Sequence, residues 1–229
     1  MDQRICILVV GMHRSGTSCM NGLLKILGFD QGKMASIGKS PDNPKGFFEN
    51  DSVRHINDHI IRNHMSCKWN DIRPEVVRSD TPYADIIRVL IKNEFSGQRF
   101  SIKDPLVSIL LDSYLEALKP IKTHVVRMHR PQNEVYDSLT RRGNEYPDHF
   151  YERYNKRLDY IIGKHKPSHI DLKFVNLVED PIAVLELIQE KFKLDLPIEE
   201  HLDQITEFVD PKLKHNPTGI FHAPSNNGV

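Results

Sequence analysis

Short apolar runs alternate with longer amphipathic stretches along this chain. The first run, Ile5 to Val10, ends at Gly11 and leads through a polar turn into helical sequence from Thr17 to Leu27. Three further runs end in polar residues and are again followed by helical sequence: Arg99 to Ile102, Thr123 to Met128 and His169 to Val175. Strands that alternate with helices form a parallel sheet covered on both faces. The pattern therefore predicts an α/β fold of the P-loop-like, three-layer type, with a central parallel sheet flanked by helices.

Additional helical segments fall between the first two predicted strands. We expect helices at Ser52 to His64 and at Tyr83 to Phe95, and we expect them to form a cap over the carboxyl edge of the strands. Two later helices are expected: Asp148 to Lys164 and Ile182 to Phe192. Residues 1–215 are expected to form a single domain, because no linker interrupts them. The last stretch, 216–229, has the Pro, Gly and Asn content of a flexible tail.

The charge balance and the cysteines exclude several classes of protein. The 229 residues carry 31 Lys and Arg against 31 Asp and Glu, so no overall field draws the chain to nucleic acid. Three cysteines without C-x-x-C spacing indicate a reducing compartment. The longest apolar run, Ile5 to Val10, is far shorter than the roughly 20 residues that span a membrane, and no signal-peptide pattern follows it. We therefore predict a cytoplasmic protein with no integral membrane association.

Polar residues that suit an anion follow three of the predicted strands. The loops are 11–18, 103–105 and 129–131, and the carboxyl ends of parallel strands gather such loops at one edge of the sheet. The first loop has the G-x-x-x-x-G spacing of a phosphate cradle, although Thr17 stands where a nucleotide triphosphatase has lysine. Its positive charge is Arg14, inside the loop. The sequence favours an anion site here over a tight turn with a surface arginine.

These loops resemble those of the sulfotransferases that use 3′-phosphoadenosine 5′-phosphosulfate (PAPS), in particular the bacterial-type, tyrosylprotein and carbohydrate branches. The similarity covers Gly-Met-His-Arg-Ser-Gly-Thr-Ser at 11–18, Lys-Asp-Pro at 103–105 and Val-Val-Arg-Met-His-Arg-Pro at 125–131. It implies PAPS as co-substrate, with no metal. The resemblance assigns the 5′-phosphosulfate to Arg14, Ser15, Gly16, Thr17 and Ser18, and the 3′-phosphate to Arg130 and Ser138. Where many relatives have Tyr-Glu-Asp-Leu, this chain has Phe-Val-Asn-Leu at 174–177.

Sulfuryl transfer needs charge stabilisation on the leaving phosphate and a base for the acceptor hydroxyl. Arg14 and Lys103 are the candidates for the first role, although Lys103 could also be a surface strand terminus. Glu49 is the first candidate base, and its alternative is an acidic residue that stabilises the positive end of the next helix. His13 is the second candidate base, or else a solvated loop residue. Asp104 is expected to orient Lys103 or to cap the next helix.

The sequence does not identify the acceptor, and it leaves two alternative functions open. The predicted acceptor is a hydroxyl of a carbohydrate, lipid or small metabolite, and the oligomeric state is not determined. His55 and His59 have a spacing that metals can use, but no third ligand is indicated, so no metal site is predicted. The first alternative is a P-loop small-molecule kinase, which would need Mg²⁺ and normally the loop lysine. The second is a non-catalytic nucleotide-binding module of the same fold.

Overall fold

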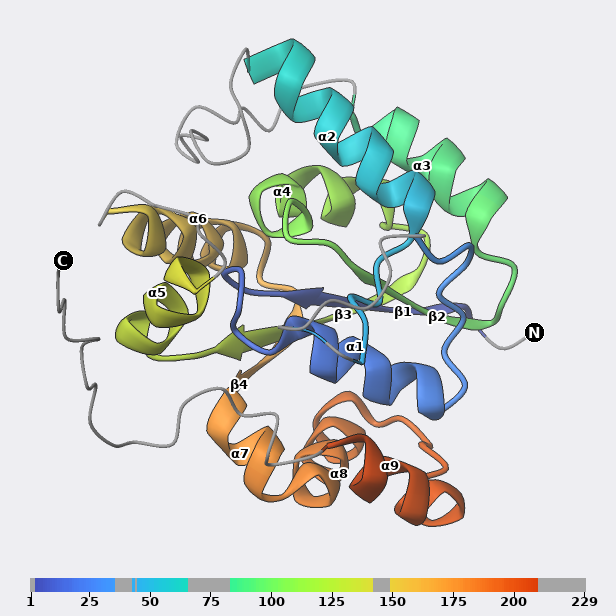
Figure 1. Cartoon of the computed structure of the whole chain (residues 1–229). Coiled ribbons are helices and arrows are strands. Elements are labelled where there is room, and N and C mark those ends of the chain that lie inside the picture. The colour runs from blue at the N-terminus through green and yellow to red at the C-terminus, as the bar shows by residue number, and fades with distance from the viewer. Residues whose placement is uncertain (1–2, 36–42, 44, 66–82, 142–148, 210–229) are drawn as a thin grey trace, which may run out of the picture.

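Parallel strands form the middle layer of the computed structural model (Figure 1), which describes residues 3–35, 43, 45–65, 83–141 and 149–209. In that part of the chain the sheet has four strands in the order β2-β1-β3-β4, all parallel. Their bounds are β1 (Ile5–Val10), β2 (Arg99–Lys103), β3 (Lys122–His129) and β4 (Ser168–Lys173). The predicted parallel sheet is therefore confirmed.

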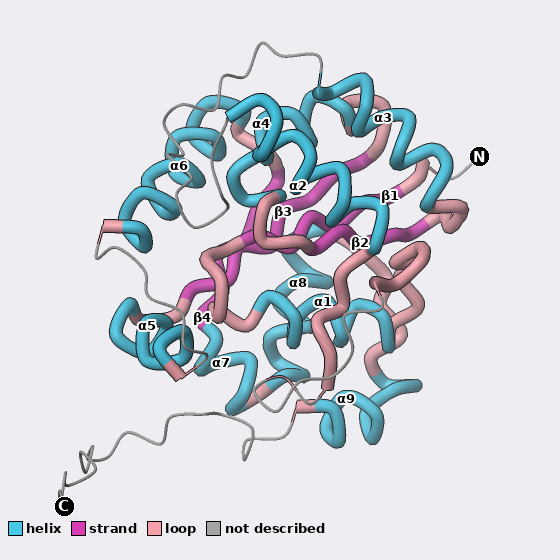
Figure 2. Tube along the Cα trace, turned by 45° about the horizontal axis from the view of Figure 1, so that its top comes forward, coloured by secondary structure: helices cyan, strands magenta, loops and turns pink. Residues whose placement is uncertain are grey.

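Helices cover both faces of this sheet. Their bounds are α1 (Thr17–Ile26), α2 (Asp51–Met65), α3 (Tyr83–Glu94), α4 (Val107–Ala117), α5 (Gln132–Thr140), α6 (Phe150–His165), α7 (Phe174–Glu179), α8 (Pro181–Phe192) and α9 (Leu202–Phe208), with a 3₁₀ turn at Glu199–His201. Figures 1 and 2 show α2, α3, α4 and α6 on one face and α1, α7, α8 and α9 on the other. The fold is thus the three-layer arrangement that the alternating pattern predicts.

The side chains of β1 explain why its sequence is apolar without interruption. Cys6, Leu8 and Val10 point into the core that α2, α3, α4 and α6 cover. Ile7 and Val9 point into the core between the other face of the sheet and α1, α7, α8 and α9. All five are at most 1% exposed. A central strand buried on both faces has no position left for a polar side chain.

The direction in which the chain crosses the sheet reverses between β1 and β3. The chain leaves β1 through α1, α2 and α3 to reach β2 on one side, and it leaves β3 through α5 and α6 to reach β4 on the other. Open parallel sheets bind ligands at such a switch point, because the outgoing loops diverge there. The loop at 11–16 and Arg130 both lie at this point.

The end of the fourth strand differs from its prediction. The apolar residues Phe174 and Val175 extend the strand in the sequence, but the chain turns into α7 directly after Lys173. This helix buries Leu177 and Val178 in the core between the sheet and the helices α1, α8 and α9. A short apolar run does not by itself distinguish a strand from one buried helical turn, and here the tertiary packing decides.

The two additional helices only partly form the predicted cap. α2 reaches the carboxyl end of β2, where its Asn57 donates a hydrogen bond to Asp104. α3 instead packs against α4, so it belongs to the helical layer over one face of the sheet. The residues 66–82 between the two helices and the predicted tail 216–229 lie outside the described residues, so the domain limits stay a prediction. No helix in the described part of the chain is long and apolar enough to cross a membrane.

A buried histidine on β3 makes the stability of the fold dependent on pH. The ring of His124 is 4% exposed, stacks on Phe192 with ring centroids 4.3 Å apart, and lies 3.0 Å from the hydroxyl of Ser168. Burial lowers the pKa of His124 from 6.5 to about 4. Between these values the unfolded chain binds a proton that the folded chain does not, so stability is complete above pH 6.5 and falls as the pH decreases toward 4.

We expect His124→Phe to remove this dependence while it keeps an aromatic ring on Phe192. At pH 4.5 the wild type should lose about 2.5 kcal/mol of unfolding free energy through this group, relative to pH 7. Urea unfolding at both pH values measures the loss in each protein. An equal loss in the wild type and the variant would contradict the assignment.

Candidate functional site at the ends of the first three strands

The loop between β1 and α1 has a backbone that only glycine permits at two positions. Gly11 and Gly16 have φ values of 148° and 91°. A Cβ atom on Gly11 would lie 2.6 Å from the backbone oxygen of Met128, and one on Gly16 would lie 2.1 Å from the ring of Phe174. Gly16 is the N-cap of α1 and offers no side chain to its first N–H groups, which leaves those donors for an anion. Close packing therefore requires glycine at both ends of this loop, and its role as a phosphate cradle stays a prediction.

A serine that the sequence analysis missed holds this loop from the neighbouring helix. Ser108 of α4 accepts a hydrogen bond from the N–H of Gly11 at 3.0 Å and donates one to its carbonyl oxygen at 3.1 Å. The hydroxyl therefore satisfies both backbone groups of the first glycine. Ser108 follows the Lys-Asp-Pro segment closely, but a lone serine in a helix gives no signal of this contact.

Arg130 approaches the cradle from the end of β3. Its Nη1 donates to the carbonyl oxygen of Arg14 at 3.1 Å, its Nε donates to Glu134 at 2.9 Å, and its guanidinium carbon lies 5.0 Å from the centre of the Phe174 ring. The remaining nitrogen, Nη2, is buried and has no hydrogen-bond partner among the described residues. A buried guanidinium nitrogen without an acceptor is costly, so an acceptor such as an anionic oxygen would stabilise this atom.

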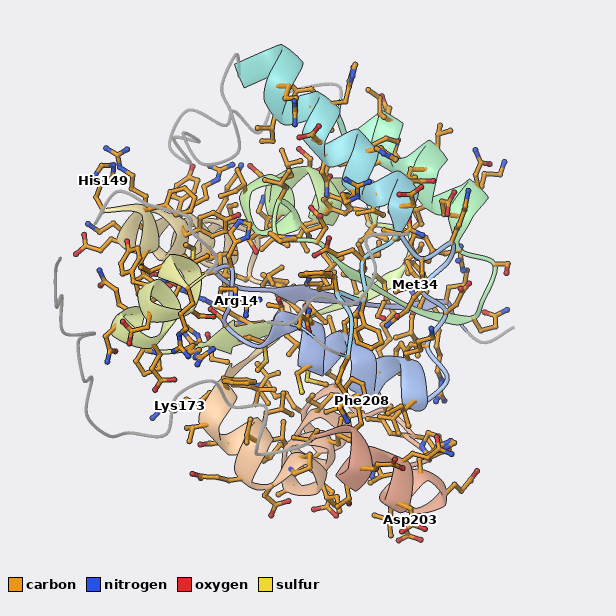
Figure 3. All side chains as sticks on the ribbon, viewed as in Figure 1. Arg14, Met34, His149, Lys173, Asp203 and Phe208 are labelled. Carbon is orange, nitrogen blue, oxygen red and sulfur yellow. The ribbon has the colours of Figure 1, made fainter. Side chains whose placement is uncertain are left out.

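Ser138 and Arg14 meet at the same place. The Nε of Arg14 donates to the hydroxyl of Ser138 on α5 at 2.8 Å. Arg14 therefore contacts both residues assigned to the 3′-phosphate, through its side chain and its carbonyl oxygen. Figure 3 shows Arg14 on the side of the molecule where β1 and β3 end, beside α5. The structure thus brings Arg14 to Arg130 and Ser138, which follow it by 116 and 124 positions in the sequence.

Lys103 and Glu49 form a buried ion pair. The Nζ of Lys103 lies 2.6 Å from a carboxylate oxygen of Glu49 and also donates to the carbonyl oxygen of Phe47 at 3.2 Å. Lys103 is 3% exposed and Glu49 is 8% exposed. The alternative interpretation of Lys103 as a surface strand terminus is therefore wrong. Asn50, and not Glu49, caps α2 through a hydrogen bond from the N–H of Val53 at 2.9 Å, so the electrostatic effect of Glu49 on that helix stays an open alternative.

Asp104, which follows Lys103 in the chain, belongs to a second buried polar network. One of its oxygens accepts from the N–H of Leu106 and from the amide of Asn57, both at 2.9 Å. The amide oxygen of Asn57 in turn accepts from the hydroxyl of Tyr114 at 2.8 Å. Burial, followed by the negative charge of Glu49, raises the pKa of Asp104 to about 6. Asp104 thus accepts from the turn before α4, whereas Leu106, the N-cap of that helix, has no side-chain cap; Asp104 also lies in the field of the Lys103–Glu49 pair.

The other predicted residues lie in and near the cradle. Ser15 and Thr17 are buried, and Ser18 is half-buried in the first turn of α1. His13 is half-buried, and its Nε2 lies 3.5 Å from the hydroxyl of Tyr154. The centre of its ring lies 5.7 Å from that of Tyr154 and 6.5 Å from that of Phe150. It is therefore packed among aromatic side chains and is not a freely solvated loop residue.

The histidine pair on α2 lies apart from this site. His55 and His59 are exposed, and His55 lies 3.7 Å from Asp51. Within the described ranges, no group of three or more His, Cys, Asp and Glu side chains is placed to hold a metal ion.

The comparisons with known proteins bear on the fold. No family model matches this chain, and no curated protein matches it. The sulfotransferase domain of the olefin synthase from Synechococcus PCC 7002 superposes with a TM-score of 0.54 at 17% identity, over 93% of this chain and 86% of that domain. This chain has the sulfotransferase fold. The fold that the resemblance implies is thereby confirmed.

Two further sulfotransferase structures are more distant. STF1 from Mycobacterium tuberculosis H37Rv has a TM-score of 0.48 at 14% identity, over 91% of this chain and 77% of that one. The sulfotransferase domain from the curacin biosynthetic pathway has a TM-score of 0.44 at 15% identity, over 85% and 75%. The fold assignment rests on the olefin synthase domain. At 17% identity this similarity shows the fold and not the activity.

Proposed function

We propose that this protein transfers a sulfuryl group from PAPS to an acceptor hydroxyl. The observation that carries the proposal is the buried Nη2 of Arg130, which lacks an acceptor among the described residues at the switch point of the sheet. A phosphate on the 3′ side of the donor would supply that acceptor. The glycine cradle at 11–16 and the uncapped start of α1 would hold the phosphosulfate at the other end.

Arg14 is suited to bind across the two anionic ends of the donor. Its carbonyl oxygen and its Nε are engaged by Arg130 and Ser138, so the cradle and the 3′ side are one connected structure. A guanidinium held in place before the donor binds does not have to be reorganised during the reaction, which increases its electrostatic effect. In this proposal Ser15, Gly16, Thr17 and Ser18 complete the cradle.

The buried pair at the end of β2 supplies the reactive groups in this proposal. Glu49 accepts the proton of the acceptor hydroxyl while that oxygen forms its bond to sulfur. The bond between sulfur and the 5′-phosphate oxygen breaks, and adenosine 3′,5′-bisphosphate leaves. Lys103 and Arg14 place positive charge where the leaving phosphate gains negative charge. His13 lies in the cradle and is the second candidate base.

The finer features of the proposal come from the sequence. We place the acceptor among carbohydrates, lipids and small metabolites, without nucleic acid as a partner, because the chain has no net charge. The cysteine pattern supports a reducing compartment, for which we propose the cytoplasm. The protein would need no metal, because charged side chains take the role that Mg²⁺ has in a kinase.

Ligand binding tests this proposal directly. Adenosine 3′,5′-bisphosphate should bind the wild type at least about tenfold tighter than AMP without added Mg²⁺, because one charge-assisted contact contributes about 1.5–3 kcal/mol. Arg130→Ala should remove that preference and weaken AMP binding much less, since AMP loses only the support that Arg130 gives the cradle through the carbonyl oxygen of Arg14, whereas Arg62→Ala, at an exposed arginine on α2, should change neither. Calorimetry with the two nucleotides measures both effects.

Two results would contradict the proposal. Tight, Mg²⁺-dependent binding of ATP with no preference for the 3′-phosphate would favour the kinase alternative. Binding of the bisphosphate without any sulfated product from PAPS and a panel of hydroxyl acceptors would favour the non-catalytic module.

A further inference from the structure

The loop that carries Glu49 has an unusual backbone. Gly46 and Phe48 both have positive φ values, 102° and 53°. The first is acceptable for glycine, but an aromatic side chain disfavours the left-handed region. Such a conformation persists only where the surrounding structure holds it. The contacts that hold the loop 45–50 therefore determine where the Glu49 carboxylate lies.

Three of these contacts come from the body of the domain. Asn21 of α1 donates to the carbonyl oxygen of Phe48 at 2.8 Å, and Lys103 donates to that of Phe47 at 3.2 Å. The N–H of Ala35 donates to the carbonyl oxygen of Glu49 at 2.8 Å. These bonds hold the backbone of the loop from the side of α1 and β2, and they leave the Phe48 ring and the Lys45 side chain to other partners.

Those partners belong to α9, close to the end of the described chain. The rings of Phe48 and Phe208 pack edge to face with centroids 5.5 Å apart. Lys45 donates to the carbonyl oxygen of Glu207 at 2.7 Å, and its Nζ lies 5.4 Å from the centre of the Phe208 ring. Figure 3 shows Phe208 where α9 faces α1. The loop is thus held from its second side by a helix remote in the sequence.

Gly22 of α1 makes room for the Phe208 ring. A Cβ atom on Gly22 would lie 2.2 Å from that ring, which is closer than any unstrained contact. Gly22 is in the middle of α1, where glycine costs helix stability and alanine would be preferred. The Phe208 ring therefore packs between α1 and the loop. Glycine is needed at position 22 because any side chain there would clash with that ring, and not because the helix favours glycine.

We infer that α9 is a latch for the Glu49 loop and that Phe208 is a positioning residue for the reaction. This inference rests on the proposed function, in which Glu49 is the base. Phe208 contacts neither donor nor acceptor in this scheme. It holds Phe48 in its left-handed conformation, which keeps Glu49 beside Lys103.

Phe208→Ala tests the latch, with Phe192→Ala as the matched control. Phe192 lies in the same apolar core and is 2% exposed, but it stacks on His124 and not on the loop. We expect Phe208→Ala to lower kcat at least tenfold with the dissociation constant of adenosine 3′,5′-bisphosphate changed less than twofold. Phe192→Ala should lower the melting temperature and leave kcat near the wild-type value, measured below both transitions.

Gly22→Ala tests the same contact from the other side. Its methyl group should displace the Phe208 ring and lower kcat, although alanine favours the helix. In the Phe208→Ala background the same substitution should have no further effect on kcat, because no ring is left to displace. Additive effects of the two substitutions would contradict the latch.

Hydrogen exchange separates failure of the latch from failure of the proposed function. The amide of Ala35, which is bonded to Glu49, should exchange at least tenfold faster in Phe208→Ala and Gly22→Ala than in the wild type and in Phe192→Ala. This readout needs no substrate, so it holds even if PAPS is not the donor. Unchanged exchange at Ala35, or an equal loss of kcat in Phe192→Ala, would overturn the inference.

Discussion

Glu49→Gln and Lys103→Met should each lower kcat with PAPS by about 100-fold or more, because a general base and a charge on the leaving group each contribute at least that much. Each substitution should also destabilise the fold by about 3 kcal/mol, because it leaves the other member of a buried ion pair without its partner. Steady-state kinetics and urea unfolding measure the two effects separately.

The double variant distinguishes catalysis from structure. With Glu49→Gln and Lys103→Met combined, neither member of the pair is left as an unpaired charge, so part of the lost stability should return while kcat stays low. The exposed pair of Glu116, at the end of α4, and Lys119, just after that helix, 2.7 Å apart, is the matched control, and Glu116→Gln with Lys119→Met should change neither quantity appreciably. Recovery of kcat together with stability would show that the pair is only structural.

Arg14→Ala should lower kcat/KM for PAPS by about 100-fold or more. One preorganised donor to a developing charge contributes about 3–4 kcal/mol, and Arg14 is also the residue through which the cradle meets Ser138. The hydrogen bond from Arg130 to the carbonyl oxygen of residue 14 survives the substitution, so the loop should keep its shape. Initial rates give the effect, and thermal unfolding checks that the fold is intact.

Two comparisons make this result specific. Arg14→Lys keeps the charge and the left-handed backbone, at a φ of 67°, but loses the planar donor to Ser138, so its rate should lie between those of the wild type and Arg14→Ala. Arg88→Ala, at an exposed arginine of α3 paired with Asp85, should keep the wild-type rate. Turnover of Arg14→Ala near that of the wild type would remove Arg14 from the reaction.

The site combines two parts with different tolerance to substitution. The cradle is determined by backbone, because Gly11 and Gly16 face Met128 and Phe174 with no space for a side chain. The Lys103–Glu49 pair is determined by side chains from a strand and from a loop that needs support. Changes in the supporting contacts should therefore affect the pair before they affect donor binding.

The sequence by itself determined the fold class and the edge of the sheet where the candidate site lies. The continuous apolar run of β1 predicts a strand buried on both faces, and the glycines at 11 and 16 predict a turn into a helix. These features are local, since they depend on residues adjacent along the chain. The positions of Arg14, Lys103 and Arg130 at strand ends follow from the same patterns, while their roles in sulfuryl transfer stay predictions.

Only the tertiary structure decided which side chains meet. The pairing of Glu49 with Lys103 joins residues 54 positions apart, and the bond between Gly11 and Ser108 joins residues 97 positions apart. The contact of Phe208 with Phe48 connects the last described helix to the Glu49 loop. No periodicity or spacing encodes such contacts, because they depend on how separate elements pack on the sheet. The neighbours of a side chain, and with them the charge it meets and the conformation it holds, are therefore properties of the folded chain.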